Sequence, residues 1–249
     1  MLAGLLVLVA LGGWEAYVDL GAKASFVLPA PHAVAQALYD DHALLWSNLL
    51  VTGQEILLGI LVALGVGFAL AVAIHLSATL RQAVYPLLVA SQAVPVVVVA
   101  PLLVFWWGFG LASKLAVITL ICFFPVVVTT VDALGAVDPE LLKLLRTLDA
   151  SRWQRLRLAE APAALPAALS GARILLAVAA IGAVFAEYVG SDSGLGHLIQ
   201  TSLSQFQTPR AYAAVVVLAL FAIACFYALT VAERRLAPWA HPPRGSTTP

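Results

Sequence analysis

Six long stretches of the sequence contain almost no charged residue, and they constrain the fold more than any other feature. A helix needs about 20 mainly apolar residues to cross the roughly 30 Å hydrocarbon layer of a membrane. Hydrophobic residues make up 62% of this chain and charged residues only 10%, whereas soluble domains carry roughly 25% charged residues. We therefore predict six membrane spans: Leu2–Val18, Thr52–His75, Val84–Phe105, Leu115–Leu134, Ala167–Val189 and Ala211–Ala232.

The length and uncharged interior of each stretch favour helices over the alternating strands of a barrel. The predicted fold class is an all-α, polytopic membrane protein with a single transmembrane domain, 1–249. No basic segment precedes the first stretch, so we do not expect a cleaved signal peptide. Cys122 and Cys225 lie inside apolar runs, and we interpret them as small hydrophobic residues and not as a disulfide.

The distribution of basic residues predicts the orientation in the membrane. Six spans place both termini on one side, and if that side is cytoplasmic, ten Lys and Arg residues face the cytoplasm and three face outward. Such an excess is typical of cytoplasmic loops. The inner residues are Arg81, Lys143, Arg146, Arg152, Arg155, Arg157, Arg173, Arg234, Arg235 and Arg244, and the outer ones are Lys23, Lys114 and Arg210. The total of 13 basic and 13 acidic residues gives no reason to expect a nucleic-acid partner.

The long cytoplasmic loop, 135–166, is predicted to form two short helices joined by an elbow. Asp138-Pro139-Glu140 is typical of a helix start, and leucines follow on one face. Asp149 interrupts this helix and can adopt a left-handed turn. Ser151 and Gln154 fit a capping box, which predicts a second helix from about Arg152 to Ala159 that ends before Pro162. The arginines could contact anionic lipid, or the loop could dock on a soluble partner.

These segments resemble the inner-membrane permeases of binding-protein-dependent ABC importers. "TLDASRW" resembles that family's Thr-Leu-Gly-Ala-Ser-Arg-Trp, and "APAALPAALSGARI" its Leu-Pro-Ala-Ala-Leu-Pro-x-x-x-x-Gly-x-Arg segment. In the family's stricter Glu-Ala-Ala pattern only Pro162 is identical, Lys143-Leu144-Leu145 occupy the Glu-Ala-Ala positions, and Asp149 replaces a glycine. The likeness extends to "LPAPHAVAQAL", "QAVPVVVVAPLLVFWWGFGLASK" and "AEYVGSDSGLGHLI", and it is strongest to the sulfonate, taurine, nitrate and thiamine- or riboflavin-precursor branch.

The resemblance implies a type I ABC importer permease in the bacterial inner membrane. It implies a homodimer of this chain, with a heterodimer as the alternative, two ATPase subunits and an extracytoplasmic solute-binding protein. The sequence has no phosphate-cradling Gly-rich loop, so no cofactor is expected on this chain, ATP-Mg would bind the ATPase, and the chain would not itself be an enzyme. Loop 135–166 would be the coupling loop, with Leu144, Leu145, Arg146, Thr147, Leu148, Asp149, Ala150, Ser151, Arg152 and Trp153 at the ATPase contact.

Inside the membrane, Glu187 is the main candidate for the transport pathway, because ionisable residues within spans are costly and often functional. It could instead be a structural carboxylate bonded to the following glycine-rich loop. Tyr188 lies beside it. Pro95 and Pro101 are expected to kink the third span and are candidates for a gate or for simple packing. Glu55 is expected at the lipid–water interface, and Trp106 and Trp107 in an interfacial belt.

The cargo is the least determined property. The segments "EYVGSDSGLG" and "SQFQTPRAYAA" resemble permeases of the thiamine-pyrimidine-precursor branch more than those for alkanesulfonates. Sulfonate, taurine, nitrate or riboflavin are the alternatives. A secondary transporter is the alternative of another class, but inverted repeats and additional intramembrane charges are typical of it. The five histidines are scattered without metal-ligand spacing, so no metal site is predicted.

Overall fold

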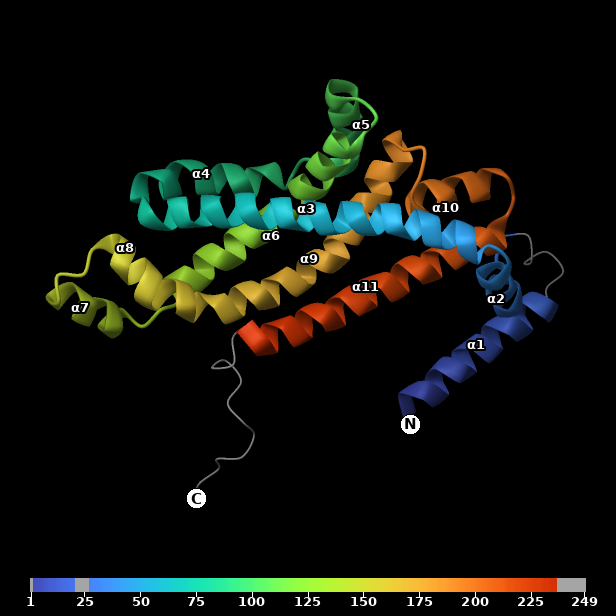
Figure 1. Ribbon diagram of the computed structural model, residues 1–249, viewed down its shortest axis with the longest axis horizontal. Coiled ribbons are helices and arrows are strands. Elements are labelled where there is room, and N and C mark those ends of the chain that lie inside the picture. Colours follow the sequence, from blue (N-terminus) through green and yellow to red (C-terminus); the bar gives the residue numbers. More distant parts are fainter. Residues whose placement is uncertain (1, 21–26, 237–249) are drawn as a thin grey trace, which may run out of the picture.

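The computed structural model describes residues 2–20 and 27–236, and it consists of helices without a strand in those residues (Figure 1). Lys23, Arg244 and the C-terminal end of the chain lie outside the described residues. The helices, with one π-helical turn η1, are α1 Leu2–Leu20, α2 Pro31–Asp40, α3 His42–Leu76, α4 Ala78–Ser91, α5 Val96–Trp107, α6 Leu111–Gly135, α7 Pro139–Thr147, α8 Arg152–Arg155, η1 Leu156–Glu160, α9 Ala161–Gly190, α10 Leu195–Ser204 and α11 Thr208–Leu236.

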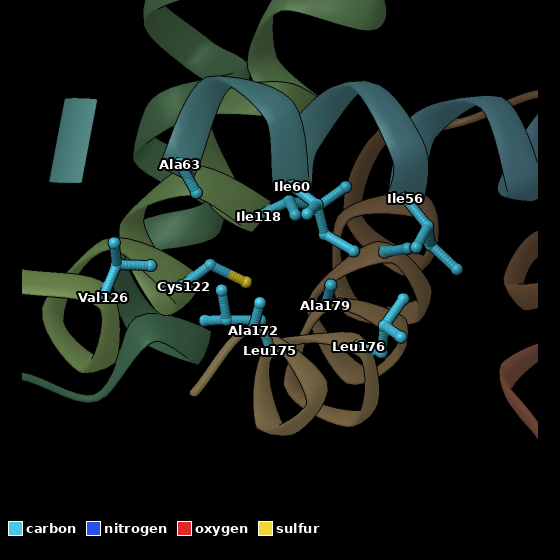
Figure 2. Packing of buried hydrophobic residues seen from close by; sticks show 11 residues of the cluster. Ile56, Ile60, Ala63, Ile118, Cys122, Val126, Ala172, Leu175, Leu176 and Ala179 are labelled. Carbon is cyan, nitrogen blue, oxygen red and sulfur yellow. The ribbon is translucent and has the colours of Figure 1, made fainter. Parts of the chain in front are cut away.

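The core lies where α3, α6 and α9 pack together. Figure 2 shows their contact, which is formed by aliphatic and small side chains. Small residues allow this approach: a Cβ added to Gly59 of α3 would lie 2.5 Å from Cγ2 of Ile118, and one added to Gly67 would lie 2.6 Å from Cγ1 of Val126. Membrane helices associate through such close packing because lipid supplies little hydrophobic drive between them. The buried residues of this cluster are Ile56, Ile60, Ala63, Ile118, Cys122, Val126, Ala172, Leu175, Leu176, Ala179 and Ala183.

Three described helices, α3, α6 and α11, are long and apolar enough to cross a membrane, and up to five segments qualify if each of two bent helix pairs counts as one span. The first, fourth, fifth and sixth predicted spans fall inside single helices, namely α1, α6, α9 and α11. The second predicted span, Thr52–His75, also falls inside a single helix, α3, which begins earlier, at His42. Polar residues such as Ser47 and Asn48 do not end a helix that projects beyond the hydrocarbon layer, so the helix is longer than the apolar run.

The predicted third span, Val84–Phe105, is a bent pair of helices, and the predicted kink at Pro95 is confirmed as a complete break. The chain breaks between α4 and α5, and the two helices meet at an angle of 100°. Pro95 is the N-cap residue of α5, and a proline has no N–H to continue the hydrogen bonds of the preceding helix. Pro101 lies inside α5 without ending it. Figure 1 shows α4 lying along α3 while α5 projects away from it.

The first helix and the elbow of loop 135–166 form as predicted. Asp138 caps α7 by accepting a hydrogen bond from the N–H of Glu140 at 2.8 Å, and Asp149 adopts a positive φ of 54°. The Ser151–Gln154 capping box is present at the start of α8. A left-handed Asp is tolerated because its short polar side chain can hydrogen-bond to the local backbone.

The predicted end of the second loop helix before Pro162 is wrong. After α8 the chain makes the π-helical turn η1 and continues directly into α9, with Pro162 in the first turn of that helix. A π-helical turn shifts the hydrogen bonds to residues five apart, and proline is tolerated at a helix start, where its missing N–H costs nothing. The loop is therefore joined to α9 without a flexible break.

Candidate functional site

The loop from α7 to α8 presents an exposed, partly apolar surface at one end of the molecule (Figure 1). No residue of α7 is buried, and Leu144, Leu148 and Trp153 are 57%, 69% and 61% exposed. Leu145 and Ala150 are half-buried, and the other predicted contact residues are exposed. Exposed large hydrophobic side chains that cluster with arginines are typical of a protein–protein contact.

Contacts across the chain fasten this loop to the transmembrane helices. Arg152 donates from Nη1 to the carbonyl oxygen of Leu76, at the end of α3, at 2.5 Å. His75 Nε2 and Glu160 Oε2 lie 2.9 Å apart, which joins α3 to η1. Leu156 is buried in a small cluster with Leu134 of α6. A force applied at the exposed surface would therefore reach α3, α6 and α9 together.

At the opposite end of α3, Glu187 is fully buried and bonded to the glycine-rich segment after α9. Its Oε1 accepts from the hydroxyl of Thr52 at 2.6 Å, and its Oε2 accepts from the N–H of Gly196 at 2.5 Å. The Thr52 hydroxyl in turn accepts from the N–H of Leu195 at 2.7 Å. Glu187 is therefore a carboxylate bonded to the glycine-rich loop, which was the alternative to a place in the transport pathway. A role in the pathway stays a prediction.

A second buried polar group, which the sequence did not indicate, lies next to Glu187. Lys114 of α6 donates from Nζ to Oε1 of Glu55 in α3 and to Oγ of Ser191, each at 2.6 Å. Glu55 and Lys114 are only 3% and 7% exposed, so Glu55 is packed inside the protein. Its expected depth at the lipid–water interface stays a prediction. A carboxylate near the outer end of the second predicted span and an ammonium directly before the fourth were the available signal, because buried charges are normally paired.

The remaining membrane candidates occupy separate positions. Tyr188 follows Glu187 and is 36% exposed. Pro101 is part of α5, which packs beside Glu187, because Ala100 and Leu103 share a buried cluster with Ala186. Trp106 and Trp107 are 67% and 59% exposed at the end of α5, which is compatible with contact to lipid.

One group of possible metal ligands occurs in the described residues, formed by Glu15, Asp19 and His32 with ligand atoms within 4.8 Å of one another. His32 Nδ1 is already paired with Glu15 Oε1. That hydrogen bond to the carboxylate raises the pKa of His32 above its ordinary value. An acidic neighbour and an exposed histidine fully account for this contact, so we assign no metal site.

Comparison with known proteins defines the class of protein that this architecture represents. The model of the family "Binding-protein-dependent transport system inner membrane component" matches residues 56–241. The chain is 36% identical over 229 residues to a probable ABC transporter permease of Haemophilus influenzae, with 92% of each chain covered. It is 39% identical to the riboflavin transport system permease of Chloroflexus aurantiacus, covering 91% of this chain and 85% of the relative.

A further relative is also a transport permease, and two solved structures are ABC transporters. The chain is 34% identical to the formylaminopyrimidine transport permease of Halalkalibacterium halodurans, with 86% of each covered. Among solved structures, an inward-facing methionine ABC transporter matches with a TM-score of 0.69 at 18% identity, covering 82% of this chain and 99% of that one. An amino acid ABC transporter matches with a TM-score of 0.63 at 14% identity, covering 82% and 97%.

The chain therefore belongs to the inner-membrane permeases of binding-protein-dependent ABC importers, with the type I importer fold. It is a multi-pass membrane protein of the permease class.

Proposed function

We propose that two copies of this chain form the pore of an ATP-driven importer for a small organic solute, with two ATPase subunits on the cytoplasmic side and a solute-binding protein outside. The observation that carries the proposal is the exposed loop from α7 to α8, which is fastened to α3 by Arg152 and by the His75–Glu160 contact. Closure of the ATPases on binding ATP-Mg would move this loop and tilt α3, α6 and α9 between outward and inward access. ATP hydrolysis belongs to the partner, and this chain supplies the mechanical link.

The coupling contact is proposed to comprise the ten residues from Leu144 to Trp153. The exposed leucines and Trp153 can supply burial at the contact, while Arg146 and Arg152 orient the partner by charge. Contact with anionic lipid is the competing use of the arginines. The leucines favour the protein contact, because α7 displays Leu144 to the surface on the same helix as Arg146.

For the cargo we propose a thiamine pyrimidine precursor. The relative named for formylaminopyrimidine transport supports this choice. The relatives named for riboflavin, aliphatic sulfonates and taurine transport, at 39%, 30% and 31% identity, define the alternatives. Riboflavin is the second candidate, because the riboflavin permease has the highest sequence identity to this chain among these three relatives.

The first experiment identifies what co-purifies with the tagged chain from its native membrane in mild detergent, by mass spectrometry. We expect a second permease copy, a stoichiometric ATPase and a solute-binding protein, whose ligand would identify the cargo. The complex in liposomes should then import labelled formylaminopyrimidine only with ATP. A chain that purifies alone and moves solute without ATP would contradict the proposal and indicate a secondary transporter.

The coupling contact is tested by replacing Asp149-Ala150-Ser151 with bulky residues. Membrane insertion should be unchanged, while ATP hydrolysis no longer responds to the loaded binding protein and uptake is lost. Ala78→Trp is the matched control, because Ala78 is also exposed but lies outside the loop, at the start of α4. Normal stimulated uptake in the loop variant would remove the coupling assignment.

A further inference from the structure

A pocket of about 290 Å³ opens between α3, the turn from α5 to α6 and the segment after α9. It lies at the end of α6 that is opposite to the coupling loop, since Lys114 is in the first turn of α6 and α7 follows its other end. Residues that bear on its chemistry are Gln54, Glu55, Phe109, Lys114, Ser191 and Asp192.

Two charged groups of the pocket, Glu55 and Lys114, are buried, while the third, Asp192, is exposed. Glu55 Oε1 accepts from Lys114, and among the described residues Glu55 Oε2 is buried with no donor near it except the neighbouring carboxyl group of Glu187. Buried polar atoms are nearly always bonded, so a carboxylate oxygen that meets only a second carboxyl group favours a ligand, a water or a shared proton. Lys114 has three N–H donors, and the structure uses them for two acceptors, Glu55 and Ser191.

The hydroxyl of Ser191 has no hydrogen-bond donor or acceptor left for a ligand. It accepts from Lys114 at 2.6 Å and from the N–H of Ser193 at 3.3 Å, and it donates to the carbonyl oxygen of Ser193. The groups at the buried wall that a ligand could bind are therefore one acceptor, Glu55 Oε2, which otherwise meets only the Glu187 carboxyl group, beside one remaining donor on Lys114. A ligand that matches this wall presents a donor next to an acceptor.

We propose that this pocket is a solute-binding site within the permease and that it takes a small, uncharged heterocycle with an amino group beside a ring nitrogen. The amino N–H would donate to Glu55, and the ring nitrogen would accept from Lys114. This inference rests on the proposed function and deepens it, because an aminopyrimidine has this edge.

Charge and size both discriminate between the possible solutes. Glu55 and Asp192 give the pocket two carboxylates against the single ammonium of Lys114. A sulfonate would therefore meet an excess of like charge, which disfavours it. The volume of about 290 Å³ is at the lower limit of small-molecule sites, roughly 300 Å³, and it suits a single ring better than the tricyclic flavin with its ribityl chain.

The test measures direct binding by the permease–ATPase complex in lipid nanodiscs, without binding protein and without nucleotide. Equilibrium dialysis with labelled formylaminopyrimidine should show saturable binding, and taurine should not compete. Glu55→Gln should weaken binding about tenfold or more, since it replaces a charge-assisted acceptor. Asp132→Asn is the control, because Asp132 is an exposed carboxylate near the other end of α6 and should bind as the unchanged chain does.

A second variant keeps the proposal testable if Glu55→Gln fails to fold. Gln54 is exposed and lines the pocket, so Gln54→Phe should fill the opening and abolish binding while leaving the Glu55–Lys114 pair intact. The pocket assignment is overturned by absent binding, by competition from taurine, or by unchanged affinity in both variants. ATP-driven uptake separates the two proposals: import of formylaminopyrimidine without binding at this pocket rejects only the pocket, whereas absent import rejects the proposed cargo.

Discussion

Glu187 holds the glycine-rich segment after α9 in place by accepting a hydrogen bond from a backbone N–H of that segment. Gly196 donates its N–H to this carboxylate, and Gly194 donates its own to Oδ1 of Asn48 at 2.7 Å. Gly194 has a φ of 110°, and a Cβ at this position would collide with both carboxylate oxygens of Glu187. Glycine is required here for its conformation and for its lack of a side chain.

We predict that Gly194→Ala destabilises the protein by at least about 1–3 kcal/mol, from backbone strain alone. The collision with Glu187 adds to this loss. Thermal unfolding of the complex in detergent, followed by near-UV circular dichroism, measures the effect. Gly65→Ala is the control, because Gly65 lies in α3 and a Cβ added there would meet no atom within 4 Å. Alanine at this position should be neutral or slightly stabilising. Equal melting of the two variants would contradict the assigned role of Gly194.

At the scale of elements, prolines act differently according to what surrounds them. Pro95 lies at the break between α4 and α5, which meet at an angle of 100°. Pro162 instead lies in the first turn of α9, directly after a π-helical turn. Proline removes the same N–H in both places. The outcome differs because η1 is packed by Leu156 and Glu160 against α3 and α6, while residues 92–95 are largely exposed.

The elbow between α7 and α8 depends on the left-handed backbone of Asp149. We predict that Asp149→Gly preserves or strengthens the elbow, because glycine adopts this conformation without steric cost. Asp149→Val should weaken it by roughly 1–2 kcal/mol, the cost of a left-handed L-residue. Hydrogen exchange of the peptide 144–155 measures the change, since the N–H of Ala150 donates to the carbonyl oxygen of Leu145 across the elbow at 3.0 Å. Faster exchange in the glycine variant would show that another feature holds the elbow.

At the scale of the whole molecule, the coupling loop and the pocket lie at opposite ends of α6. Five basic residues lie in α7, α8 and η1, which predicts that this end is cytoplasmic: Lys143, Arg146, Arg152, Arg155 and Arg157. The α3–α6–α9 core joins the two ends through close packing at Gly59 and Gly67. Packed interiors transmit displacement well, so this core can carry a movement of the loop toward the pocket.

We predict that Asp192→Cys reacts with a membrane-impermeant maleimide in intact cells, and that Arg146→Cys reacts only after the membrane is permeabilised. Both positions are exposed, so the difference reports the side of the membrane. Replacing Cys122 and Cys225 by alanine removes the background, and that cysteine-free chain is the control. Labelling of Arg146→Cys in intact cells would show that the loop faces outward. That result would contradict the predicted orientation of the chain in the membrane.

The membrane class, the helical fold, and the first loop helix with its elbow could all be predicted from the amino-acid sequence. Each of these depends on residues close together in the chain: apolar runs, the Asp138 cap, the Ser151–Gln154 box and the left-handed Asp149. Packing between distant segments set how far α3 extends before Thr52, how sharply the third span bends at Pro95, and how η1 passes into α9. It alone paired Lys114 with Glu55 and Thr52 with Glu187, because partners 59 and 135 residues apart meet only when helices pack.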